Sequence, residues 1–94
     1  MNTRQLGKSD LFVTPIGLGT WAIGGGDNPF GWGPQDDQDS IRTIHKALDL
    51  GINWIDTAKG YGRGHSEKIV GQAVKDRRDD VILATKCGIL WEED

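Results

Sequence analysis

The chain has 94 residues, 36% of them hydrophobic, so it offers at most one small domain with a modest core. Its 11 basic and 14 acidic residues give a net charge of −3 without any basic run, which argues against a nucleic-acid partner. No apolar run approaches the roughly 18 to 20 residues that a membrane span needs. The single cysteine, Cys87, cannot form an internal disulfide. We therefore expect a cytoplasmic protein with no membrane attachment.

The first third of the chain predicts a hairpin, a strand and a loop. Residues 3–13 contain two short strand-like runs on either side of the turn formers Gly7 to Asp10, which is typical of a hairpin. Residues 16–20 are apolar and contain two glycines, so they predict a strand at which another group packs close to the backbone. Residues 22–35 have no periodicity, three consecutive glycines and two prolines, and they predict a long loop.

The first predicted helix has clear start and stop signals. Acidic residues at 36–39 suit its N-terminus, and Gly51 suits its end. Ile41, Ile44 and Leu48 recur at helical spacing between these signals.

The remaining chain predicts a strand at 52–56, a helix at about 66–75 and a strand at 81–85. Ser66 and Glu67 are expected to cap the helix and to place an acid in its first turn. Residues 81–85 are a continuous run without charge, which favours a strand buried on both faces.

Strands that alternate with helices imply a parallel sheet wrapped by helices. In barrels of this class, catalytic groups sit at the C-terminal ends of the strands. The three predicted strand ends carry Thr20 with Trp21, Asp56 with Tyr61, and Lys86. We therefore expect these side chains to gather at one edge of the sheet.

Tyr61, Lys86 and Asp56 together predict a proton-donating site. A phenol with a pKa near 10 is a poor acid at neutral pH, and a neighbouring ammonium lowers that pKa. Lys86 can supply this ammonium, and Asp56 can keep it protonated. The three residues would then provide an acid, the positive charge beside it and the counter-ion of that charge.

Three segments carry a family resemblance: Gly17-Leu18-Gly19-Thr20-Trp21, the stretch 56–67 with the pattern Asp-Thr-Ala-x-x-Tyr-Gly-x-Gly-x-Ser-Glu, and Ala84-Thr85-Lys86. They resemble the N-terminal third of the aldo-keto reductase superfamily, in its bacterial NADP-dependent branch related to potassium-channel beta subunits. The implied fold class is α/β: an N-terminal β-hairpin plus the βαβαβ portion of a (β/α)8 TIM barrel. Residues 1–94 would then be the N-terminal fragment of one barrel domain, incomplete in this chain.

The resemblance implies an NADPH-dependent oxidoreductase that reduces a small aldehyde or ketone to an alcohol. By the family pattern, Tyr61 is the general acid, Lys86 lowers its pKa and Asp56 pairs with the lysine. The implied cofactor-binding residues are Gly19, Thr20, Trp21 and Asp56. The aromatic residues that could line a substrate pocket are Trp21, Trp32 and Trp91. The family's catalytic histidine and its adenosine-phosphate segments fall beyond Asp94, so we expect the isolated chain to be inactive.

The sequence is also compatible with two other classes of protein. The chain could be a non-catalytic interaction module, such as a channel-associated relative, or a remnant that assembles with a complementary fragment. Lys86 could instead form a Schiff base in an aldolase. His45, His65 and Cys87 lack the spacing of metal ligands, so no metal is expected. The open edges of an incomplete sheet favour self-association, including a homo-oligomer.

Overall fold

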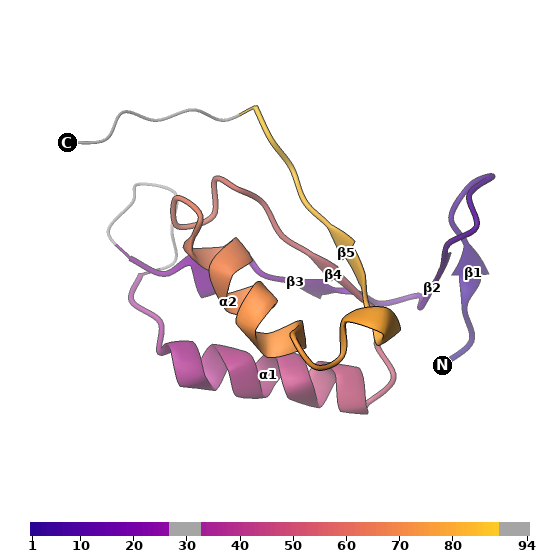
Figure 1. The fold of residues 1–94 in the computed structure, drawn as a ribbon, viewed down its shortest axis with the longest axis horizontal. Coiled ribbons are helices and arrows are strands. Elements are labelled where there is room, and N and C mark those ends of the chain that lie inside the picture. The colour runs from indigo at the N-terminus through magenta and orange to yellow at the C-terminus, as the bar shows by residue number, and fades with distance from the viewer. Residues whose placement is uncertain (27–32, 89–94) are drawn as a thin grey trace.

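A computed structural model describes residues 1–26 and 33–88. Its elements in chain order are β1 (Arg4–Gln5), β2 (Phe12–Val13), β3 (Leu18–Gly19), the 3-10 helix η1 (Trp21–Gly24), α1 (Asp37–Asp49), β4 (Trp54–Asp56), α2 (His65–Val74), the 3-10 helix η2 (Arg78–Asp80) and β5 (Ile82–Ala84). Strands β1 and β2 form an antiparallel hairpin, which lies apart from the other elements at one end of the molecule (Figure 1). The predicted hairpin is thereby confirmed.

The second sheet is parallel and has the order β3-β4-β5. Gly19 is opposite Asp56, and Asp56 is opposite Ala84, so the three strands end level with one another. Because the strands are parallel, these ends share one edge of the sheet. The alternation of strands and helices in the sequence therefore predicted the topology correctly.

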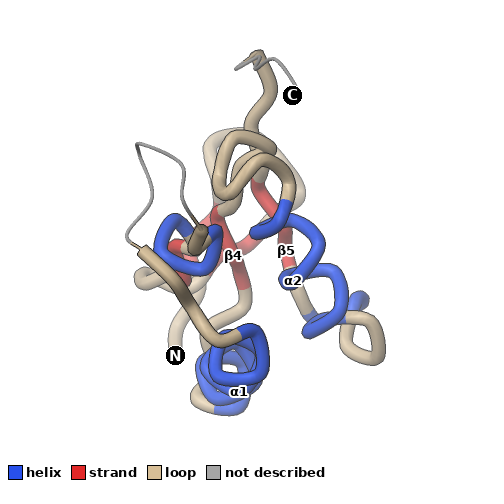
Figure 2. The backbone as a smooth tube through the Cα atoms, turned by 90° about the vertical axis from the view of Figure 1, so that its left-hand side faces the viewer, coloured by secondary structure: helices blue, strands red, loops and turns tan. Residues whose placement is uncertain are grey.

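Helices α1 and α2 pack side by side (Figures 1 and 2). Helix α1 starts where predicted, because the Asp36 carboxylate accepts a 3.0 Å hydrogen bond from the Asp39 amide. The chain then turns away at Gly51, whose φ of +101° suits glycine. Both helices pack onto the sheet through one cluster of buried apolar residues: Ile23, Ile44, Ile55, Ile69, Val70, Ala73, Val74 and Val81.

Helix α2 begins differently from the prediction. Its N-cap is Gly64, with a φ of +95°, and the first helical residue is His65. The prediction that Ser66 caps the helix was wrong, because the Ser66 side chain is fully buried and bonds to Thr20 and Thr57 instead. The first turn of α2 is therefore attached to the sheet by its serine.

The predicted strands are longer than the observed ones, and the last one is less buried. Val81 is buried, whereas Ile82 and Leu83 are half-buried and Ala84 is exposed. The expectation that this strand is buried on both faces was wrong, because none of the residues of β5 is fully buried. The predicted loop over 22–35 also begins with structure, because η1 buries Ile23 in the core. Residues 27–32 of that loop lie outside the described chain.

The hairpin is attached to the start of β4, away from the strand ends that carry the polar residues. The Asn53 side chain donates to the Phe12 carbonyl over 2.8 Å and accepts from the Thr14 amide over 2.9 Å. The strand predicted at residues 16–20 does have a group packed against its backbone, as expected. A Cβ on Gly17 would overlap the indole of Trp54. No helix in residues 1–26 and 33–88 is both long and apolar enough to cross a membrane.

Candidate active site

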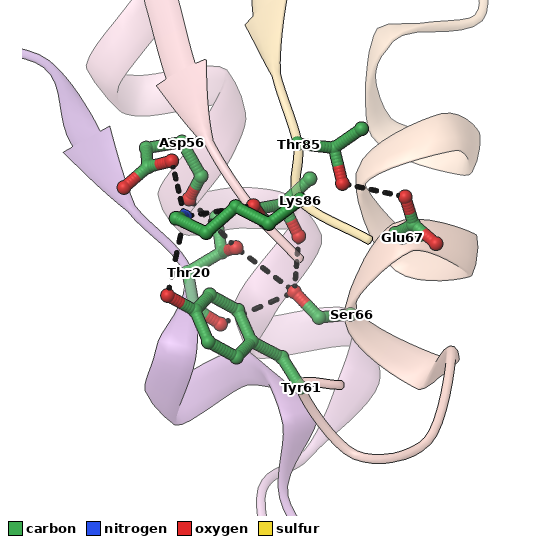
Figure 3. A network of polar contacts seen from close by, with 8 residues as sticks. Thr20, Asp56, Tyr61, Ser66, Glu67, Thr85 and Lys86 are labelled. Carbon is green, nitrogen blue, oxygen red and sulfur yellow. Dashed lines mark hydrogen bonds and ion pairs between the residues drawn. The ribbon is translucent and has the colours of Figure 1, made fainter. Parts of the chain in front are cut away.

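Lys86 contacts the other two residues of the predicted proton-donating site, Asp56 and Tyr61. Its ammonium donates to Oδ1 of Asp56 over 2.7 Å and to the Tyr61 hydroxyl over 3.4 Å (Figure 3). A third hydrogen bond, of 3.1 Å, goes to the Thr57 carbonyl. The ammonium thus lies between a carboxylate and a phenol that belong to a different strand end and its following loop.

The charge on Lys86 is held by its partners. The hydrogen bond that Lys86 donates to Asp56 raises the pKa of Lys86 above its ordinary value of 10.5, and the contact with Tyr61 raises it further, while desolvation opposes both. Lys86 is therefore cationic at neutral pH. The Lys86 and Asp56 side chains are 53% and 41% exposed, so this pair contributes little to folding stability. Its consequence is a fixed positive charge beside the phenol.

The Tyr61 ring is held on its faces as well as at its hydroxyl. Its centroid lies 6.2 Å from that of Trp21, and the two rings are stacked with an angle of 16° between their planes. The Lys86 ammonium lies 5.2 Å from the centroid of the same ring, within the range of a cation–π contact. The Tyr61 backbone is also bonded, because its carbonyl accepts from the Ser66 amide over 3.1 Å.

Three buried hydroxyls connect the strand ends to α2. Thr57 and Ser66 are 2.9 Å apart, Ser66 donates to the Thr20 hydroxyl over 2.9 Å, and Thr20 donates to the Asp56 carbonyl over 3.1 Å. Each hydroxyl has one proton, and Ser66 and Thr20 direct theirs along the chain, so Thr57 is the donor to Ser66. The contribution of Thr57 and Ser66 to the site was not predicted from the sequence. The available signal was that hydroxyl residues directly follow two strand ends and open the next helix.

Two contacts anchor the segments around the site. Thr85 donates to Glu67 of α2 over 2.6 Å, which fixes the residue next to Lys86 (Figure 3). His65 pairs with Asp37 over 2.7 Å and so joins the starts of the two helices. The described part of the chain contains no group of three or more His, Cys, Asp or Glu side chains that could hold a metal ion.

The predicted cofactor-binding residues differ in accessibility. Among the described residues, none comes within 4 Å of a Cβ placed on Gly19, so they leave the end of β3 open. Trp21 is 48% exposed, and Asp56 is partly exposed. Thr20 is 0% exposed and its hydroxyl is bonded inside the protein, so its side chain supports the site from behind and is not available to a ligand. Trp32 and Trp91, predicted to line a pocket, lie outside the described residues.

Comparison with known proteins identifies the family of the chain. The Aldo/keto reductase family profile matches residues 15–94. The chain is 54% identical over 93 residues to the NADH-specific methylglyoxal reductase of Escherichia coli strain K12, covering 98% of this chain and 28% of that protein. Among solved structures, a holo-form aldo-keto reductase from Bacillus halodurans superposes with a TM-score of 0.83 at 41% identity, covering 98% of this chain and 28% of the other.

An aldo-keto reductase from Klebsiella pneumoniae, solved in complex with NADPH, superposes with a TM-score of 0.73 at 34% identity, covering 92% of this chain and 28% of the other. The chain thus spans less than a third of the length of each of these relatives. These neighbours are (β/α)8 barrels, and the described residues form the hairpin and the βαβαβ portion of one, without a closed barrel. The chain belongs to the aldo/keto reductase family.

Proposed function

We propose that this chain supplies the proton-donating part of a nicotinamide-dependent reductase that converts small aldehydes or ketones to alcohols. The observation that carries the proposal is the position of the Lys86 ammonium, 2.7 Å from Asp56 and 3.4 Å from the Tyr61 hydroxyl. The family of the chain and the name of its methylglyoxal-reducing relative support the same reaction class.

Tyr61 is the proton donor in this proposal. Its hydroxyl oxygen accepts a hydrogen bond from Lys86, and among the described residues its own proton has no acceptor. That proton is free to be donated to the oxygen of a substrate carbonyl. The phenolate that remains is stabilised by the N–H bond and the positive charge of Lys86, while Asp56 keeps Lys86 protonated.

The residues at the strand ends fit a nicotinamide cofactor, which would supply the hydride. The described residues leave open space beside Gly19 at the end of β3. Lys86 bonds one of the two Asp56 carboxylate oxygens, so the other can accept from a ribose hydroxyl. Trp21 offers a partly exposed aromatic face beside Tyr61 for the cofactor or an apolar part of the substrate. We assign NADPH as the cofactor, in line with the Klebsiella pneumoniae neighbour. The relative from Escherichia coli is named NADH-specific, so both cofactors belong in the test.

The aldolase interpretation is disfavoured by the electrostatics of Lys86. A lysine that forms a Schiff base needs a pKa low enough to leave the amine neutral. Asp56 and Tyr61 act in the opposite direction, because both raise the pKa of Lys86.

The proposal can be tested in a chimera in which residues 1–94 replace the matching segment of the Escherichia coli relative. Oxidation of NADPH and NADH would be followed with methylglyoxal as the substrate. We expect turnover with the chimera, and a loss of turnover in its Tyr61→Phe and Lys86→Met variants. A folded chimera that binds cofactor and does not reduce the aldehyde would contradict the proposal. Turnover that survives both substitutions would contradict the assigned roles.

A further inference from the structure

The 3-10 helix η1 contacts Tyr61 at two separate places. At its first residue, the Trp21 ring stacks on the Tyr61 ring. At its last residue, the backbone of Gly24 lies against the peptide that joins Tyr61 to Gly62. The two segments are far apart in sequence, and one four-residue turn therefore contacts both the side chain and the main chain of the same tyrosine.

The contact between the two backbones leaves no room for a side chain at Gly24 or at Gly62. A Cβ on Gly24 would lie 2.7 Å from the Gly62 nitrogen and 2.7 Å from the Tyr61 carbonyl carbon, well inside van der Waals contact. A Cβ on Gly62 would overlap the Gly24 carbonyl, and the φ of Gly62 is +65°. The close approach of the two backbones therefore requires a glycine at both positions, since a side chain on either one would overlap the other segment.

The position of η1 is itself fixed by the core and by the site. Ile23 is 7% exposed and belongs to the buried cluster, and Thr20, just before η1, is bonded to Ser66 and to Asp56. Lys86 follows β5 and bonds to Asp56, so its position does not depend on η1. A shift of the Tyr61 loop relative to η1 would therefore move the Tyr61 hydroxyl relative to the Lys86 ammonium.

We propose that η1 positions Tyr61 and that Gly24 is its positioning residue, because the absence of a side chain there sets the distance between the Tyr61 hydroxyl and the Lys86 ammonium. The inference rests on the proposed role of Tyr61 as proton donor. In this role Gly24 acts through its contact with the Tyr61–Gly62 peptide. In Gly24→Ala the new methyl group pushes the Tyr61–Gly62 peptide away, and the hydrogen bond between Tyr61 and Lys86 lengthens or breaks.

The first readout does not need catalysis. Lys86 would be titrated by NMR through its side-chain nitrogen in the chimera. Because the contact with Tyr61 raises the pKa of Lys86, Gly24→Ala should lower that pKa, by no more than Tyr61→Phe does. In the Tyr61→Phe background, Gly24→Ala should produce no further shift, since the two act through the same contact.

Two other glycines provide matched controls. In Gly17→Ala the added methyl overlaps the Trp54 ring, so that variant should lose stability without changing the Lys86 titration. In Gly71→Ala the methyl meets nothing within 4 Å among the described residues, on an exposed position inside α2, so that variant should stabilise the helix slightly and leave the Lys86 titration unchanged. A Gly24→Ala protein that is merely destabilised, with Lys86 unmoved, would overturn the inference. So would a Lys86 shift that persists in full without the Tyr61 hydroxyl.

A milder variant decides the matter if Gly24→Ala does not fold. Ile23→Val removes one methylene from the base of η1, and Ile44→Val removes one from the same core within α1. Only Ile23→Val should lower the pKa of Lys86, and an equal effect of both would contradict the inference.

The second readout is kinetic and uses the chimera. Gly24→Ala should lower kcat by about 10- to 100-fold with little change in KM, since the misplaced group acts only in the transition state. An inactive chimera whose Lys86 still responds to Gly24→Ala would refute the proposed reaction and leave the positioning role intact. An active chimera in which Gly24→Ala changes neither Lys86 nor kcat would refute the positioning role alone.

Discussion

Lys86 donates to the hydroxyl oxygen of Tyr61 over 3.4 Å, although the two residues are 25 positions apart in the sequence. The direction of this bond matters for the chemistry. Because the ammonium has no acceptor lone pair, Tyr61 can only accept from it, and the phenol keeps its own proton for another partner.

The hydroxyl of Tyr61 is therefore predicted to be essential for turnover. In the chimera, Tyr61→Phe should lower kcat by roughly 10²- to 10⁴-fold, the range that a general acid contributes, while KM stays nearly constant. Gln72→Ala, at an exposed position of α2, is the control and should leave both constants unchanged. A Tyr61→Phe loss confined to KM would mean that Tyr61 binds the substrate and does not protonate it.

Asp56 is predicted to control the protonation of Lys86. Asp56→Asn removes the strongest influence that raises the pKa of Lys86, so the titration of Lys86 should move down toward 10.5. NMR titration of the Lys86 side chain measures this directly. Asp49→Asn, which breaks the 2.8 Å pair with Arg77, should leave Lys86 unchanged.

The same pair predicts a small pH dependence of stability. Since folding raises the pKa of Lys86, its favourable contribution is fully present below the unfolded pKa and is lost as pH rises through the folded pKa. The difference in urea midpoint between wild type and Asp56→Asn should thus hold from neutral pH to about pH 10 and shrink above it. A difference that grows with alkaline pH would contradict the assigned pairing.

Ser66 is predicted to be a stability residue through its buried hydroxyl bonds. Ser66→Ala leaves the Thr57 hydroxyl without its acceptor in a fully buried place and should cost about 1–3 kcal/mol in the free energy of unfolding. Urea unfolding monitored by circular dichroism measures this cost. Thr43→Ala removes an exposed hydroxyl that bonds to the Asp39 carbonyl and should cost less than about 0.5 kcal/mol. Equal costs for the two variants would show that the buried hydroxyl chain adds nothing.

A polypeptide of residues 1–94 by itself is predicted to be inactive and to self-associate. Among the described residues, β3 and β5 each have a partner on one side only, and unpaired strand edges promote association. The site is also open to water, with Lys86 half exposed. Sedimentation velocity over a range of concentrations, together with an NADPH oxidation assay, tests both statements. A monomer with robust turnover would contradict them, and the chimera serves as the comparison.

Much of the fold could be read from local patterns. The capping carboxylate of Asp36, the spacing of Ile44 and the glycine at Gly51 each act within one helix, so the sequence alone predicted α1 and its ends. The residue types and order of Asp56, Tyr61 and Lys86 likewise predicted a proton-donating site, because parallel strands must bring their ends to one edge.

Local patterns failed where a distant segment competes for a residue. Ser66 has the side chain of a helix cap, yet its hydroxyl bonds to Thr20, which is 46 positions earlier. Trp21 to Gly24 lack periodicity and were predicted to end a strand and begin a loop, yet they form a turn against Tyr61. The close contact between Gly24 and Gly62 likewise cannot be predicted from the residues that adjoin either glycine in the sequence.

The sequence by itself thus determined which groups are present and in what order the strands deliver them, since strand and helix signals depend on neighbouring residues. Only the tertiary structure decided that the ammonium of Lys86 bridges Asp56 and Tyr61, that Thr20 faces inward, and that η1 contacts Tyr61. These outcomes depend on distances between segments that become neighbours only when the core has packed, so no local pattern encodes them.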